Sequence, residues 1–261
     1  MTENTLEFKE QESAWYITAP LYILRLIVGG MVGWFTIKVV DYFRRMFKQP
    51  YLPPYSVTLD TDDLSTLQSQ ALAIAVANLQ DGIEPRLLLD GSQKLVVCAG
   101  RRNFREPWAR DLSFASFGLV ELGNYQAVRE SLEVFLINQR PNGQFPIKAH
   151  STGIFNRFLH SLFRREQPII APLKPKYMSG HRTMSLDGNA LLVIAALNYA
   201  DRTKDTRFLR EHWPKLRRAL IWLGEHAHDD GLLHQEAFSD WADTIARVGR
   251  VIYTNVIYWK A

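Results

Sequence analysis

The sequence repeats one unit, a pair of adjacent helices in which the first is apolar on most sides and the second is amphipathic. Apolar residues at helical spacing predict such pairs over 112–122 with 125–138 and over 187–201 with 205–228. A third apolar helix is expected from Val251. A helix that is apolar nearly all round must be buried, so the first members form an inner layer and the amphipathic members an outer one. The sequence therefore predicts an all-α fold of stacked hairpins, an (α/α) toroid.

The N-terminal part does not follow this pattern. Residues 1–13 are polar and acidic, which predicts a loose tail and not the basic start of a signal peptide. The segment 21–40 is apolar and has the length that a bilayer-crossing helix needs. Three basic residues follow it, namely Arg44, Arg45 and Lys48. By the positive-inside rule they predict a membrane anchor with the C-terminal domain in the cytoplasm. The alternative is an apolar helix packed on the globular domain, which three glycines would allow to approach closely.

Composition and punctuation divide the chain and exclude several classes. The proline-rich segment 49–59 predicts a linker between the tail and apolar helix (1–48) and the helical domain (60–261). A single cysteine, Cys98, fits a reducing compartment and excludes an internal disulfide. The net charge is +4 with basic residues spread along the chain, so we expect no nucleic-acid binding. No metal-ligand cluster, phosphate-binding glycine loop or nucleophile elbow is present in the sequence, so we expect no metal and no cofactor.

Two smaller features lie between the helices. Apolar runs at 87–89 and 95–98 flank Asp90-Gly91 and predict a small β-hairpin. The long proline-containing segment 144–184 is expected to be functional or mobile. Within it, 154–165 is an amphipathic helix that would suit a membrane surface or the rim of a barrel. We favour the rim, because one short helix is weak evidence for lipid.

Two short stretches combine a tryptophan with charged residues at the entrance of a helix, which suits a polar ligand with a flat apolar face, such as a sugar. Trp241 lies between Asp240 and Asp243, and Trp108 precedes Arg110-Asp111. An indole face stacks on a sugar ring, and a carboxyl beside it loses hydration, which raises its pKa toward that of a proton donor. The alternative is structural in both places, with aspartates capping helices, tryptophans in the core and a helix N-terminal ion pair.

These stretches resemble a known family. The W-A-R-D of 108–111, the S-L-D-G of 185–188 and the W-A-D of 241–243 are similar to motifs of glycogen debranching enzymes of the amylo-α-1,6-glucosidase type. The segment 247–261, R-V-G-R followed by T-N-V-I-Y-W-K-A, also resembles that family. The resemblance extends from about 101 to 261, and neutral invertases share a similar layout. It implies a six-hairpin glycosidase domain, and this sequence supplies three to four hairpins, so we expect an incomplete toroid, truncated at its C-terminus.

The resemblance also implies a reaction and roles for residues. The family hydrolyses α-glucosidic bonds with inversion, using one carboxylic acid to protonate the leaving oxygen and a second carboxylate to activate water. Asp243 falls on the aspartate expected as general acid. The other candidate positions are expected to bind substrate, and Asp240 is included although the family offers no counterpart for it. They are Trp108, Arg110, Asp111, Asp187, Asp240, Trp241 and Asn255.

Two departures from the family pattern keep other functions open. Tyr253 stands where the family has a glutamate, and the family's catalytic base belongs to a later hairpin. The expected partner is an oligosaccharide or polysaccharide of the α-glucan type. One alternative is sucrose, as for neutral invertases, and another is a non-catalytic carbohydrate-binding protein. We expect a cytoplasmic location, with possible anchoring through 21–40.

Overall fold

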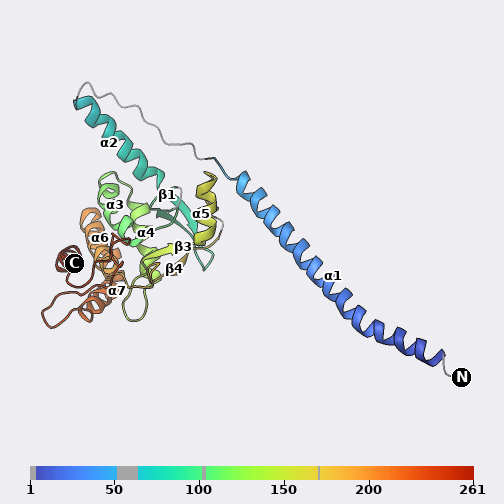
Figure 1. Cartoon of the computed structure of the whole chain (residues 1–261). Coiled ribbons are helices and arrows are strands. Elements are labelled where there is room, and N and C mark those ends of the chain that lie inside the picture. Colours follow the sequence, from blue (N-terminus) through green and yellow to red (C-terminus); the bar gives the residue numbers. More distant parts are fainter. Residues whose placement is uncertain (1–3, 52–63, 102–103, 170) are drawn as a thin grey trace. The chain divides into compact units, whose positions relative to one another are not determined.

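The computed structural model describes residues 4–51, 64–101, 104–169 and 171–261, with side chains in the first helix from Ile23 onward. It divides into two compact units, Met1–Pro50 and Tyr51–Ala261. Most of the expected linker 49–59 lies outside the described residues. The described part of the second unit is mostly α-helical, as predicted (Figure 1).

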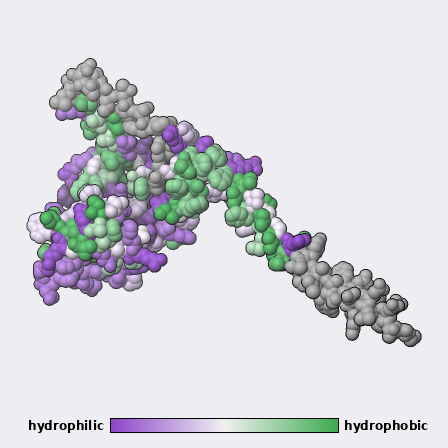
Figure 2. Space-filling model, viewed as in Figure 1, coloured by the Kyte–Doolittle hydropathy of each residue, from purple (hydrophilic) through white to green (hydrophobic). Residues whose placement is uncertain are grey.

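Helix α1 spans Asn4–Lys48 and is the only helix described in the first unit. The loose tail expected over 1–13 is therefore corrected, because the helix begins at Asn4. Extending an existing helix adds a hydrogen bond with each residue, and Glu, Lys and Gln are good helix formers. Among the described residues, one stretch, Ile23–Lys48, is long and apolar enough to cross a membrane by length and composition, with a mean hydropathy of 1.7. Most of its large apolar side chains are exposed, with Met46 near its end as a buried exception, and Figure 2 shows a mainly green segment.

The second unit is built on the predicted pairs of helices. Their bounds are α3, Ala109–Glu121; α4, Tyr125–Ile137; α6, Asp187–Thr203; α7, Thr206–Gly224; and α8, Ile252–Lys260. Helix α6 packs against α3, α7 and α8, and α4 packs on α3. The sequence placed these helices within a few residues, and the largest difference is the end of α7, four residues earlier than expected. Helix α2, Leu64–Asp81, lies against α3.

The core lies between the inner helices α3 and α6 and the outer helices α4 and α7. Helix α6 is buried on almost every side over its first ten residues, as a helix apolar nearly all round must be. The amphipathic helices α4 and α7 each contribute one buried face. The largest core side chains of this cluster include Leu112, Leu119, Leu132, Phe135, Phe208 and Leu216.

Short strands add to the helices, so the described part of the chain is mostly α, which bears out the predicted class in part. Strands β1, Ile83–Leu87, and β2, Gln93–Val97, form the predicted antiparallel hairpin, which turns at Asp90-Gly91. Strands β3, Lys148–His150, and β4, Lys174–Lys176, pair within the long segment 144–184. The pairing of three residues in each strand joins the two ends of that segment to each other.

Two local features in the same region matter below. Gly143 has φ +104°, and a Cβ built on it would lie 2.3 Å from the carbonyl oxygen of Arg218 in α7. Helix α5, Ile154–Leu162, is the predicted amphipathic helix. Its large apolar side chains Ile154, Phe155, Phe158 and Leu162 are exposed, and its position at a barrel rim stays a prediction.

Candidate functional site

A pocket of about 960 Å³ opens at the N-terminal ends of α3 and α8. Helix α2, strand β2 and the loop around Trp241 complete its walls. The pocket is polar at Arg110, Asp111 and Asp243 and otherwise largely apolar. Five of the candidate residues line it, namely Trp108, Arg110, Asp111, Trp241 and Asp243. Candidate residues from Trp108 to Asp243 therefore meet here, at the N-terminal ends of α3 and α8.

Asp187 explains why the helix ends converge. It is the first residue of α6, and its side chain has no exposed surface. It accepts hydrogen bonds from Arg110 Nη1 at 3.3 Å and from the Tyr253 hydroxyl at 3.3 Å, and a third from the Ser185 hydroxyl. Arg110 comes from α3 and Tyr253 from α8. One buried carboxylate thus joins the starts of α3, α6 and α8 beneath the pocket.

Tyr253 is a pocket residue that the sequence analysis treated only as a departure from the family pattern. Burial raises the pKa of its hydroxyl, and the negative charge of Asp187 raises it further. The hydroxyl therefore stays protonated near neutral pH and donates to Asp187. A carboxylate at this position would face Asp187 directly, and like charges so close are unfavourable. The tyrosine is consistent with the buried acid beside it.

The two pocket carboxyls have different surroundings. Asp111 is exposed, as Asp243 is, but it lies in a concave wall of the pocket. Partial loss of hydration there raises its pKa, although the neighbouring Arg110 acts in the opposite direction. Asp243 is exposed in the loop after Trp241. A raised pKa is a property expected of a proton donor, and both carboxyls can be reached by a ligand in the pocket.

Aromatic side chains stand on both sides of the polar groups. The Trp108 ring lies edge-on to Phe104 at 5.9 Å, and the Lys148 ammonium lies 4.6 Å from its centroid. The buried Trp108 Nε1 finds no hydrogen-bond acceptor among the described residues. Trp241 is 58% exposed and meets Tyr253 edge-on at 6.4 Å. An exposed indole supplies a flat apolar surface with little ordering entropy.

Two candidate residues lie elsewhere. Asp240 is buried and accepts hydrogen bonds from Gln235 Nε2 at 2.9 Å and Arg247 Nη2 at 2.8 Å. Burial alone would raise the pKa of Asp240, but these bonds outweigh it and lower the pKa. The side chain of Asn255 accepts a hydrogen bond from the Leu233 N–H at 2.8 Å and donates one to the Leu233 carbonyl at 3.0 Å. The structure therefore gives both residues contacts that fold the loop before α8, and it does not place them among the pocket residues that we expected.

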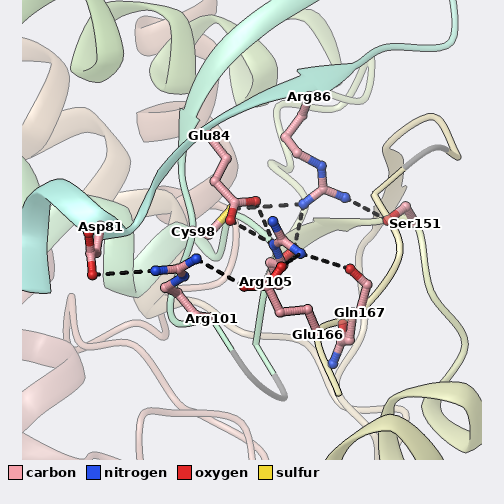
Figure 3. A network of polar contacts seen from close by, with 9 residues as sticks. All are labelled: Asp81, Glu84, Arg86, Cys98, Arg101, Arg105, Ser151, Glu166 and Gln167. Carbon is pink, nitrogen blue, oxygen red and sulfur yellow. Dashed lines mark hydrogen bonds and ion pairs between the residues drawn. The ribbon is translucent and has the colours of Figure 1, made fainter. Parts of the chain in front are cut away.

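A buried ionic network, which the sequence analysis missed, supports the wall on the other side (Figure 3). Arg105 donates from Nε to both oxygens of Glu84, at 2.6 and 2.8 Å, and from Nη1 to Glu166 Oε2 at 3.0 Å. Arg101 Nη2 donates to Glu166 Oε1 at 2.9 Å. Arg86, which is almost fully buried, donates to the Arg105 carbonyl and to Ser151 Oγ at 2.6 Å.

The network fixes the connection between β2 and α3, whose residues Phe104 and Trp108 line the pocket. Glu84 and Arg86 alternate on the buried face of β1, and that period of two was the available sequence signal. Cys98, also at the pocket wall, lies 3.8 Å from Arg86 Nη1. Burial raises the pKa of the Cys98 thiol to about 12, so it is protonated at neutral pH.

The arrangement can bind a polar ligand that carries hydroxyl groups and a flat apolar face. Among the described residues, no three His, Cys, Asp or Glu side chains are grouped so that they could hold a metal ion. A scan of protein-family models and a search of curated proteins found no match to this chain. The function is therefore argued from the site itself.

Proposed function

We propose that the pocket binds a sugar unit of an α-glucan and that the chain is a glycoside hydrolase. The observation that carries this proposal is the meeting of Trp108, Trp241, Arg110, Asp111 and Asp243 in one pocket. Guanidinium and carboxylate groups bind vicinal hydroxyls, and exposed indoles stack on the apolar face of a pyranose ring. The resemblance described above assigns the same residues to substrate binding and acid catalysis.

In the proposed reaction, Asp243, which the resemblance assigns as the general acid, protonates the glycosidic oxygen as the bond to the sugar breaks. Arg110, held by Asp187, and Asp111 grip the hydroxyls of the non-reducing sugar, while Trp241 supports the ring. Inversion requires a second carboxylate about 6.5–9.5 Å away to activate water. Asp111 and Asp243 are the carboxylates among the described residues that line the pocket. Asp243 has the role of the acid and Asp111 binds sugar hydroxyls, so we leave the base unassigned.

The proposal includes the architecture. Helices α3, α6 and α8 start at one end of the bundle, where Asp187 joins them, and α4 and α7 lie outside them. This is the arrangement of inner and outer helices that an (α/α) toroid repeats around its axis. We therefore propose that the second unit is an arc of such a toroid, with the sugar site at its inner rim.

A second candidate function is carbohydrate binding without hydrolysis. The observation that favours it is Tyr253, which occupies the position of a family glutamate and directs its hydroxyl to Asp187. The pocket residues would still bind a sugar, whereas activation of water would need a group other than these residues. Sucrose is the alternative small substrate for either function.

Glucose release from maltooligosaccharides, limit dextrin and sucrose tests the hydrolase directly. We expect the full chain to be active, and Asp243→Asn to lower the rate by about a hundredfold or more, the usual contribution of a general acid. Asp229→Asn is the matched control, since Asp229 is an exposed aspartate that does not line this pocket.

Binding of the same sugars separates the two functions. Trp241→Ala should weaken binding by about tenfold, the order of one lost aromatic contact. Sugar binding without hydrolysis would support the second function and reject the first. A chain that binds none of these sugars would reject both.

We also propose that α1 anchors the chain in a membrane. The length and hydropathy of Ile23–Lys48 support this, together with the exposure of most of its apolar side chains. Arg44, Arg45 and Lys48 follow the apolar part and favour the cytoplasmic side for the second unit.

A further inference from the structure

Helix α5 has its polarity reversed with respect to the usual surface helix. Its large apolar side chains point to solvent and form one stripe at helical spacing. Four of them are strongly exposed: Ile154 (77%), Phe155 (68%), Phe158 (62%) and Leu162 (62%). Figure 2 shows green surface in the region where Figure 1 labels α5. An exposed apolar patch on a protein surface is a common mark of a contact site.

Polar contacts hold the opposite face of α5 against the protein. His160 is buried, and its Nδ1 lies 2.9 Å from the carbonyl oxygen of Glu166. Arg157 Nη1 lies 3.6 Å from Glu106 Oε2, a carboxylate that is fully buried. Rotating the helix to bury its apolar stripe would break these contacts. It would separate the charge of Arg157 from the buried Glu106 carboxylate, which is unfavourable. The outward direction of the stripe is therefore fixed by the fold.

The C-terminal end of α5 carries positive charge. Arg164 is exposed and Arg165 follows it, and both contact Tyr51. The Arg164 guanidinium donates to the Tyr51 hydroxyl at 3.4 Å, and the Arg165 guanidinium lies 5.5 Å from the centroid of the Tyr51 ring. An apolar stripe with arginines at its end matches the two layers of an anionic bilayer surface, acyl chains below and charged headgroups above.

Tyr51 also limits how far this helix can lie from α1. Only Gln49 and Pro50 separate it from Lys48, the last residue of α1. Three residue steps of extended chain reach about 11 Å at most. If α1 spans a bilayer, the covalent chain keeps Tyr51, and with it the end of α5, near the headgroups. This part of the argument depends on the proposed anchor and not on the proposed sugar chemistry.

We propose that α5 is a second membrane contact, lying in the interface of a bilayer that contains anionic lipid, with its apolar stripe in the acyl region. The stripe of four residues reaches the upper acyl chains, and Arg164 and Arg165 meet the lipid phosphates. The contact orients the second unit on the surface, since one anchor alone leaves it free to rotate about the connection at Gln49-Pro50. A protein partner could also cover an apolar stripe, but the neighbouring span favours lipid.

A fluorophore on α5 tests this in the full chain. Phe158→Cys places a thiol on the stripe for labelling with an environment-sensitive probe. The one native cysteine, Cys98, is buried and its thiol pKa is about 12, so it should not compete for the label. Leu72→Cys is the matched control, because Leu72 on α2 is equally apolar and 66% exposed. Both variants are reconstituted in phosphatidylcholine vesicles with and without phosphatidylglycerol.

We expect the probe at position 158 to be quenched by spin labels on the acyl chains and protected from aqueous iodide by about fivefold or more relative to position 72. Protection should increase with phosphatidylglycerol, because one arginine near an anionic surface changes the partition by about fivefold. Equal iodide quenching at both positions in vesicle-bound protein would overturn the proposal and leave the anchor intact. Iodide protection without acyl-chain quenching would indicate a protein contact, including a second copy, and would also overturn it. A chain that fails to bind vesicles would reject both the anchor and the α5 contact.

Discussion

Replacing Asp187 by asparagine tests the junction that brings the three inner helices to one pocket. The substitution keeps the shape of the side chain but removes its charge and leaves a single acceptor oxygen. Three donors converge on the carboxylate, from Arg110, Tyr253 and Ser185. At least one donor must therefore lose its acceptor, and the amide nitrogen would be directed at another donor.

The magnitude follows from burial. Breaking a buried ion pair destabilises by about 3–5 kcal/mol. Asp187 has no exposed side-chain surface, whereas the Arg110 side chain is 17% exposed and can be partly hydrated from the pocket. We therefore expect the lower end, about 3 kcal/mol. With a urea dependence of about 2–3 kcal/mol per molar for a unit of this size, the midpoint of unfolding should fall by about 1 M.

Urea titration of the full chain, followed by tryptophan fluorescence, measures this midpoint. A detergent without a sugar headgroup keeps α1 in solution and leaves the proposed sugar site free. Asp201→Asn is the control on the same helix, since Asp201 is 75% exposed and pairs with Lys204 at the surface. The reasoning is refuted if both variants unfold at the same urea concentration.

Sugar binding gives an independent readout of the same variant. Freed from Asp187, Arg110 is no longer positioned, and losing one charge-assisted hydrogen bond weakens binding by about ten- to a hundredfold. Unchanged affinity for maltooligosaccharides, in a protein that does bind them, would mean that Arg110 does not depend on Asp187 for its position.

Three other changes probe the pocket wall, its titration and the outer layer. The pKa of Asp111 is raised in the folded protein. The free energy of unfolding should therefore decline as pH rises from about 4 through that pKa. Asp111→Asn should remove this decline, which urea midpoints measured from pH 3 to 8 would detect. Arg105→Gln leaves Glu84 without its buried cation and Glu166 with Arg101 alone. It should destabilise by about 3 kcal/mol, with faster hydrogen exchange in the connection from β2 to α3. Gly143→Ala drives a Cβ into the backbone of α7 and should lower the free energy of unfolding by more than about 3 kcal/mol. Gly123→Ala, at φ +77° with open space around it, should lower it by about 1–2 kcal/mol. Equal thermal midpoints for the two variants would contradict the geometry.

Periodicity was sufficient to predict the helices. The apolar surface of α6 and the single apolar faces of α4 and α7 follow from residue spacing, so their bounds were predicted to within a few residues. The hairpin of β1 and β2 was predicted from Asp90-Gly91, although β1 begins four residues before the expected run. The structure of 1–13 was not predicted, because local composition does not show whether a helix beginning further along will extend through a polar segment.

The candidate site was predicted only in part, since neighbours in sequence can point to different places. Asp240 and Asp243 stand three residues apart, yet the first is buried against Arg247 and the second lines the pocket. Similar carboxylates in one loop carry no signal that separates these roles. The network of Arg86, Arg105 and Glu84 was missed for a related reason, since its partners come from segments far apart in the chain.

The sequence by itself determined the helices of the second unit, which of them are buried, and that one stretch has the length and hydropathy of a membrane span. These properties depend on the spacing of apolar side chains within about twenty residues. The tertiary structure alone decided that Asp187 would join α3, α6 and α8, and that the apolar stripe of α5 would face outward. Those outcomes depend on pairing between charges far apart in sequence, because a buried charge is stable only where the fold brings it a partner.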